Sequence, residues 1–182
     1  FSGKTPVIWR GECKILPGGF KPKQTFPVGT VLRRGLPIQV DFDDMSAGVV
    51  KIAKVLDGGT TSAARIGKGH LFVVGDKVQK LGTTTSTTVN KIDTSNADYD
   101  EITGLAAGDN IQESDGQSSA KPLYTPNMVV GADLEFKGTG IPTIDAAYEA
   151  VVLYNNADYP IPADWLQGVT LKSNPNILFI KQ

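Results

Sequence analysis

The sequence has little of what metal binding and acid–base catalysis usually require, because it contains one cysteine and one histidine. The lone Cys13 excludes an internal disulfide, and we expect it to be a small buried side chain in a strand. Zinc sites use several cysteine or histidine ligands, so this composition argues against one. A Ser-His-Asp or Cys-His arrangement would have to use His70, which we expect to be structural or exposed at the start of a strand.

Signatures of nucleotide, nucleic-acid and membrane binding are also missing. The chain has no G-x-S-x-G elbow and no G-x-x-x-x-G-K-[ST] loop, and Gly67-Lys68-Gly69 lacks the spacing of a dinucleotide fingerprint. The net charge is −1, from 18 basic and 19 acidic residues, which argues against a nucleic-acid partner. No apolar run approaches the ~20 residues that span a bilayer. We therefore expect no cofactor, no nucleic acid and no membrane among the partners.

Oxygen ligands gather in two acidic segments, where calcium binding can be tested. The first contains Asp41, Asp43 and Asp44, and the second contains Asp93, Asn96, Asp98, Asp100 and Glu101. Read as an EF-hand loop from Asn96, the second segment has Glu101 where glycine is needed and Ala107 where the bidentate glutamate belongs. An EF-hand is excluded, an irregular site stays open, and solvated turns explain both segments better.

The most informative pattern that is present is a recurring glycine corner, in which two small or apolar residues precede a glycine and an aliphatic residue follows three positions later. The copies are Pro27-Val28-Gly29-Thr30-Val31-Leu32, Val73-Val74-Gly75-Asp76-Lys77-Val78, Ala106-Ala107-Gly108-Asp109-Asn110-Ile111 and Val129-Val130-Gly131-Ala132-Asp133-Leu134. Glycine tolerates positive φ, and a following aspartate suits a tight turn. Each copy therefore predicts the end of one strand, a sharp turn and the start of another.

These patterns predict a mainly β chain, a compact barrel or sandwich of short strands with tight glycine turns, in a single domain over residues 1–182. The polar segment 113–121 is the best candidate for a mobile loop and for a subdivision. Asp145 could cap a short helix near 145–154, since Ala147, Ala150 and Val151 would share one side, but the same residues could form a strand. The chain begins at Phe1 rather than Met, so we expect an initiator or processed segment ahead of it.

The candidate interface residues are aromatic: Trp9, Tyr154, Tyr159 and Trp165. The last three gather near the C-terminus with Pro160 and Pro162. A packed patch of proline and aromatic side chains is one interpretation. Tyrosine and tryptophan are also enriched in interface hot spots, and a sugar-binding platform is a third interpretation.

Several segments together resemble the head-decoration and head-fibre proteins of tailed bacteriophages. They are Gly29-Thr30-Val31-Leu32, Ile38-Gln39-Val40, Ala53-Lys54-Val55-Leu56 and the run from Lys68 to Val78, with Asn174 to Ile180 similar to a closing strand. The resemblance covers roughly the first half of the chain. It implies a β-rich protein without catalytic residues that docks onto a capsid shell, often as a trimer, and it transfers no functional residue.

We therefore expect a non-enzymatic virion protein on the capsid surface of a phage or prophage, with the major capsid protein as partner and a homotrimer as the assembly. A carbohydrate-binding module of a secreted or surface protein is the alternative, and it would use Trp9, Trp165 or Tyr159. A hydrolase would need His70 or a pair of carboxylates, and the sequence gives no reason to choose one pair.

Overall fold

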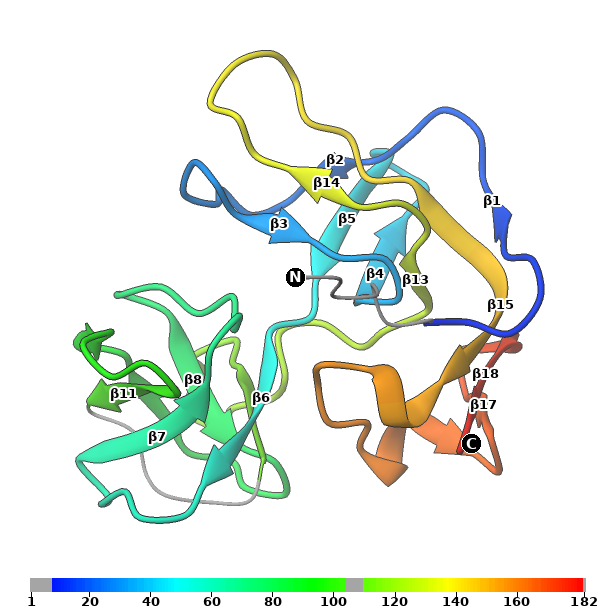
Figure 1. Ribbon diagram of the computed structural model, residues 1–182. Coiled ribbons are helices and arrows are strands. Elements are labelled where there is room, and N and C mark those ends of the chain that lie inside the picture. The colour runs from blue at the N-terminus through cyan, green and yellow to red at the C-terminus, as the bar shows by residue number, and fades with distance from the viewer. Residues whose placement is uncertain (1–7, 104–109, 182) are drawn as a thin grey trace. The chain divides into compact units, whose positions relative to one another are not determined.

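A computed structural model describes residues 8–103 and 110–181 of the chain, which folds into two compact units (Figure 1). Unit 1 comprises Phe1–Val49 and Tyr124–Gln182, and unit 2 comprises Val50–Leu123. Unit 2 is thus inserted into unit 1. The sequence favoured a single domain with a subdivision near 113–121, whereas these boundaries lie at 49/50 and 123/124.

The chain is mainly β, as the sequence predicted, with several sheets of short strands consistent with a sandwich. Over the described residues the sheets stay open, so the barrel alternative is not realised. The helical elements in this part of the chain are two single 3₁₀ turns, η1 (Tyr154–Asn156) and η2 (Ala163–Trp165). Neither has the length or the apolar character needed to cross a membrane.

Unit 1 is built on a nine-stranded sheet. Its order is β16 (Leu166–Gln167), β17 (Thr170–Leu171), β18 (Asn174–Ile180), β15 (Ala146–Leu153), β13 (Met128–Val130), β4 (Pro37–Asp41), β5 (Ser46–Val49) and β2 (Lys21–Pro22), with β1 (Lys14–Ile15) also pairing with β15. A separate two-stranded antiparallel sheet joins β3 (Val31–Leu32) to β14 (Leu134–Glu135). Neighbours are antiparallel except β15 with β18 and β2 with β5, which are parallel.

The short helix expected near 145–154 is wrong, because Ala146–Leu153 forms the strand β15. This strand pairs with β13, β18 and β1, so its backbone groups are bonded on both sides. A central strand buries both of its faces, which removes the alternation that marks a half-buried strand. The small residues Ala146, Ala147 and Ala150 are buried and imitate a helical face in the sequence. Tertiary pairing therefore decides the conformation of this segment.

Unit 2 is a seven-stranded antiparallel sheet. Its order is β10 (Lys91–Asp93), β11 (Tyr99–Thr103), β7 (Ala63–Gly67), β6 (Ile52–Leu56), β12 (Asn110–Glu113), β8 (Lys77–Lys80) and β9 (Ser86–Thr88). A hydrophobic core of its own contains Ala53, Ala64, Ile66, Phe72, Val78, Val89, Ile102 and Ile111. Unit 2 therefore has both a sheet and a hydrophobic core of its own.

At two of the glycine corners the predicted turn and the strand after it form, but the predicted strand before the glycine does not. Gly29 and Gly75 have φ of 91° and 96°, and they precede β3 and β8. The copy at Gly131 lies between the end of β13 and the start of β14, as predicted, but Gly131 has no positive φ. Glycine is needed there for close approach, since a Cβ would lie 2.8 Å from the side chain of Ile15. The copy at 106–111 falls largely outside the described residues. The strand expected at 70–74 does not form, so His70 lies in an irregular segment.

Candidate functional site

The turn between β4 and β5, residues 41–46, is the most distinctive exposed feature of unit 1, and we call it the acidic turn. Asp41 and Ser46 face each other at the end of the hairpin. The turn between them exposes Phe42 to 57% and Met45 to 45%, although both side chains are large and apolar. Asp43 and Asp44 separate these two side chains along the chain.

Met45 holds an unusual backbone conformation, with φ of 53°. Its carbonyl oxygen accepts a hydrogen bond of 3.0 Å from the backbone N–H of Lys21. Every other described residue with a positive φ is a glycine. A side chain with a Cβ is disfavoured in this region, so the turn stores strain at Met45.

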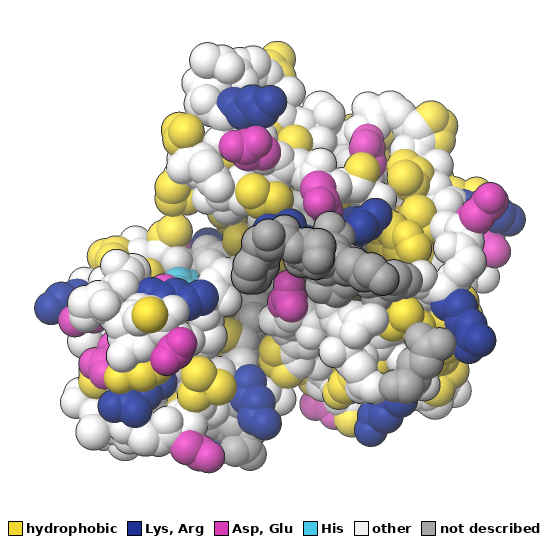
Figure 2. All heavy atoms as spheres, viewed as in Figure 1, with side chains coloured by type: hydrophobic (Ala, Val, Ile, Leu, Met, Phe, Trp, Pro, Cys, Tyr) yellow, Lys and Arg dark blue, Asp and Glu magenta, His cyan; other side chains and the backbone are white. Residues whose placement is uncertain are grey.

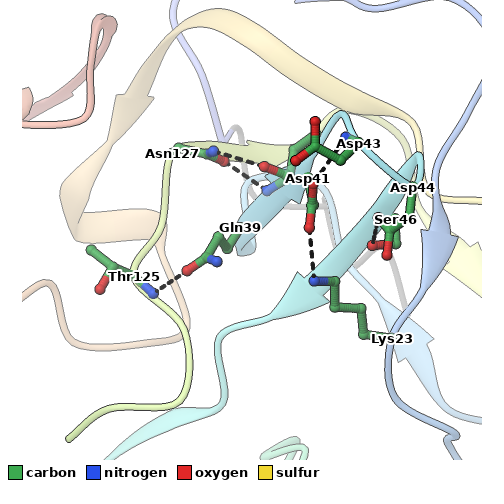
Figure 3. A network of polar contacts seen from close by, with 9 residues as sticks. Lys23, Gln39, Asp41, Asp43, Asp44, Ser46, Thr125 and Asn127 are labelled. Atoms are coloured by element: carbon green, nitrogen blue, oxygen red, sulfur yellow. Dashed lines mark hydrogen bonds and ion pairs between the residues drawn. The ribbon is translucent and has the colours of Figure 1, made fainter.

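Contacts within the acidic turn fix its shape (Figure 3). Asp43 donates its backbone N–H to Asp41 Oδ1 at 2.9 Å, and Lys23 Nζ reaches Asp41 Oδ2 at 3.4 Å. The hydroxyl of Ser46 donates to Asp44 Oδ1. These bonds join the turn to itself and to the segment that follows β2.

The strand behind the turn is held in place by side chains from the segment that leads into β13. The Val40 N–H donates to Asn127 Oδ1 at 2.8 Å, while Asn127 Nδ2 donates to the Val40 carbonyl at 3.0 Å. The Thr125 N–H donates to Gln39 Oε1 at 2.8 Å. Figure 3 shows both amide side chains bridging between β4 and this neighbouring segment. The acidic turn therefore extends from a strand, β4, that is hydrogen-bonded to this neighbouring segment.

Phe42 contacts a buried aromatic ring. It packs edge-on against Phe20, with ring centroids 5.9 Å apart and an interplanar angle of 79°. Phe20 is itself buried and bonds through its backbone to Ile144. Such edge-to-face packing favours one orientation of the ring. The exposed part of Phe42 is therefore presented in a fixed position.

The acidic turn carries negative charge that other residues only partly neutralise. Lys23 pairs with Asp41, but neither Asp43 nor Asp44 forms an ion pair with another described residue. The hydrogen bond from the Ser46 hydroxyl, together with the more distant charge of Lys23, outweighs desolvation and lowers the pKa of Asp44 below its usual value. Asp44 therefore stays ionised at neutral pH.

The sequence predicted Asp41, Asp43 and Asp44 as a solvated turn, and the structure confirms that. The sequence pattern did not single out the two apolar residues within that turn, Phe42 and Met45. The available signal was a phenylalanine between aspartates, in a segment whose polarity predicts a loop. The exposure of Phe42 depends on the β4–β5 register, which the sequence alone does not specify.

The lone histidine belongs to a buried ion-pair cluster in unit 2. His70 Nε2 lies 2.7 Å from Asp100 Oδ2, and Lys68 Nζ bonds Asp100 Oδ1 and, at 3.0 Å, the Thr94 carbonyl. Burial works to raise the pKa of Asp100, but the hydrogen bonds and charges of Lys68 and His70 outweigh it and leave that pKa below its usual value. His70 Nδ1 is buried and bonds no described residue. No described hydroxyl or thiol is hydrogen-bonded to the ring.

A second buried cation lies in the same unit. The Lys51 side chain is only 2% exposed, and its Nζ lies 2.8 Å from Asp76 Oδ2 and 3.6 Å from Glu113 Oε2. Asp76 Oδ2 also accepts the Val73 N–H at 2.9 Å. A buried lysine flanked by carboxylates ties the loop before β8 to β12 and the start of β6.

The second acidic segment lines a polar pocket of about 190 Å³, formed by Asp93, Ser95, Asn96, Tyr99 and Glu101. Arg65 covers the Tyr99 ring at 4.4 Å from its centroid and lies 3.7 Å from Glu101. The Ser95 side chain and N–H lower the pKa of Asp93 by hydrogen bonding. The described residues hold no group of three His, Cys, Asp or Glu side chains arranged for a metal ion.

The four aromatic candidates all lie in unit 1, where each has at least one described contact or is buried. Trp165 is buried in η2, and Trp9 forms an isolated bridge with Val152. Tyr154 bonds the Ile161 carbonyl at 3.5 Å, and the Tyr159 hydroxyl donates to the Gly35 carbonyl. An interface role for these residues stays a prediction.

Cys13 is half-buried and lies just before β1 rather than within a strand. Burial raises the pKa of its thiol, against the opposing effects of a backbone hydrogen bond and of Arg34. A raised pKa keeps the thiol protonated, which disfavours nucleophilic chemistry at this position.

Comparisons with protein-family models, with curated protein sequences and with solved structures gave no significant match. The functional argument therefore rests on the residues and geometry of this chain.

Proposed function

We propose that this chain is a non-enzymatic structural protein of a tailed-phage or prophage virion, which attaches to the exterior of the capsid. The observation that carries the proposal is the acidic turn, where Phe42 and Met45 are held exposed on a fixed backbone. The Phe42 ring, which is oriented by Phe20, loses little conformational freedom on binding, and aromatic side chains and methionine are enriched in interfaces. The resemblance of the first half of the chain to head-decoration and head-fibre proteins supports the same function.

The proposed partner is the major capsid protein, and the proposed assembly is a homotrimer. A symmetric assembly on a symmetric shell multiplies individually weak contacts into strong overall attachment. The net charge of −1 favours docking by local complementarity over long-range attraction. Figure 2 agrees with this, since Lys and Arg side chains are interspersed with Asp and Glu over the face in view.

Co-sedimentation tests this function. The full chain is mixed with empty shells assembled from the capsid protein encoded alongside it, and the pellet is assayed for both proteins. We expect saturable binding at a fixed ratio to the shell subunit, and light scattering should give the mass of a trimer. An unrelated globular protein of similar size serves as the control and should stay in the supernatant. A chain that remains monomeric and unbound at micromolar shell concentration contradicts the proposal.

A further inference from the structure

We propose that the acidic turn, residues 41–46, is the surface through which the chain docks, and that it fits a protein surface with an apolar pocket rimmed by lysine or arginine. This inference rests on the proposed function and names the docking surface for it. Three features of the turn point to it independently: a strained methionine, an anchored exposed phenylalanine and uncompensated carboxylates.

The backbone at Met45 is the first argument. The chain uses glycine at every other described position with positive φ, and such a residue would relieve the strain at position 45. A turn that served only to reverse the chain has no use for a methionine there. Keeping an exposed thioether at a cost in strain indicates that the side chain itself makes a contact. Methionine is well suited to that role, because it adapts its shape to an apolar partner.

Phe42 provides the second argument. Its edge-on contact with Phe20 leaves 57% of the residue exposed while fixing the direction of the ring. A ring held in this way can enter a pocket with little loss of conformational entropy. Phe42 and Met45 are the first and last of the four residues between the paired Asp41 and Ser46, so one partner surface can bury both side chains.

Charge identifies the chemistry of the partner. Asp43 and Asp44 form no ion pair with a described residue, and the Ser46 hydroxyl donates a hydrogen bond to Asp44 Oδ1. A partner that buries the neighbouring apolar side chains must face these carboxylates, and cationic groups complement them. Ile141 is 85% exposed, but glycine and proline flank it and no carboxylate is adjacent to it in sequence. Ile141→Ala is therefore a matched control for binding that is driven by exposed apolar surface in general.

The experiment measures affinity for the assembled shells by quantitative co-sedimentation, using the full chain and four variants, of which the last is the control. Phe42→Ala is expected to weaken binding at least tenfold. Met45→Gly is expected to weaken it about fivefold while raising or preserving the melting temperature, because strain is released. The double variant Asp43→Asn with Asp44→Asn is expected to lose less affinity than the wild type loses when the salt concentration is raised. Ile141→Ala is expected to bind as the wild type does.

The outcomes separate the inference from the function on which it rests. A wild-type chain that does not bind shells overturns the proposed function. A wild-type chain that binds, with Met45→Gly and the double Asn variant binding equally well at all salt concentrations, overturns only the choice of surface. Equal losses in Ile141→Ala and Phe42→Ala also overturn it, because binding then reflects general hydrophobicity. If Phe42→Ala fails to fold, the other two variants decide the question.

Discussion

The ring of Tyr124 lies so close to Gly48 that a Cβ at position 48 would be 2.6 Å from the ring carbons Cε1 and Cζ. Gly48 belongs to β5, where it pairs with Gln39. Glycine inside a strand costs stability because it gives up more backbone freedom than alanine. Its presence here is explained by the aromatic ring that occupies the space of its missing side chain.

Gly48→Ala is accordingly expected to lower the free energy of unfolding by about 1–3 kcal/mol, the usual cost of overpacking. In a Tyr124→Ala background the same substitution should become neutral or stabilising, since the clash is gone. Chemical denaturation of the four proteins of this cycle measures the coupling. Additive effects of the two substitutions would contradict the proposed contact.

Lys51 is expected to be essential to unit 2. Lys51→Met leaves Asp76 and Glu113 buried without their shared cation, so the free energy of unfolding should fall by about 3–5 kcal/mol. Lys54→Met is the matched control, because Lys54 is exposed on β6, which begins directly after Lys51, and it should change stability by less than about 0.5 kcal/mol. Denaturant titration compares them, and equal stability of the two variants would show that the buried pairing contributes little.

Acid should destabilise unit 2 through Asp100. Its folded pKa lies below the ordinary 3.8, so the folded state binds the proton less tightly than the unfolded state. The contribution of Asp100 is therefore complete above about pH 5 and is lost as the pH falls through the lowered pKa. Asp100→Asn should flatten the decline of melting temperature below about pH 4. The exposed Asp57→Asn control should leave that decline in place, and an unchanged acid profile in Asp100→Asn would contradict this assignment.

Tyr159 is expected to stabilise unit 1 through its hydroxyl. Burial is the main cause that raises the pKa of Tyr159, with a smaller effect from Asp158, and its hydroxyl donates to the Gly35 carbonyl. Tyr159→Phe removes that bond and should cost about 1–2 kcal/mol of unfolding free energy. Tyr148→Phe is the control, because the Tyr148 hydroxyl makes no hydrogen bond to a described residue. Thermal melts that shift equally for both variants would argue against a specific role for this hydroxyl.

Sequence patterns were reliable where local chemistry decides the structure. Glycine corners located the turns at Gly29 and Gly75, because positive φ is a local requirement that few other residues meet. The same rule failed to find the turn at Met45, where a non-glycine residue accepts that conformation. The acidic segment 41–44 was predicted as a turn, but its two exposed apolar residues were not recognised as a feature.

The amino-acid sequence by itself determined that this protein is β-rich and turn-dense, since glycine, proline and β-branched residues act on the backbone around them. Only the tertiary structure decided that 146–153 is a central strand, that residues 50–123 form an inserted unit, that His70 is hydrogen-bonded to Asp100 and that Lys51 is held in an ion pair. These outcomes depend on partners that lie tens of residues away along the chain, as Asp100 does from His70. Contacts of that range follow from strand order and register, which local propensity does not encode.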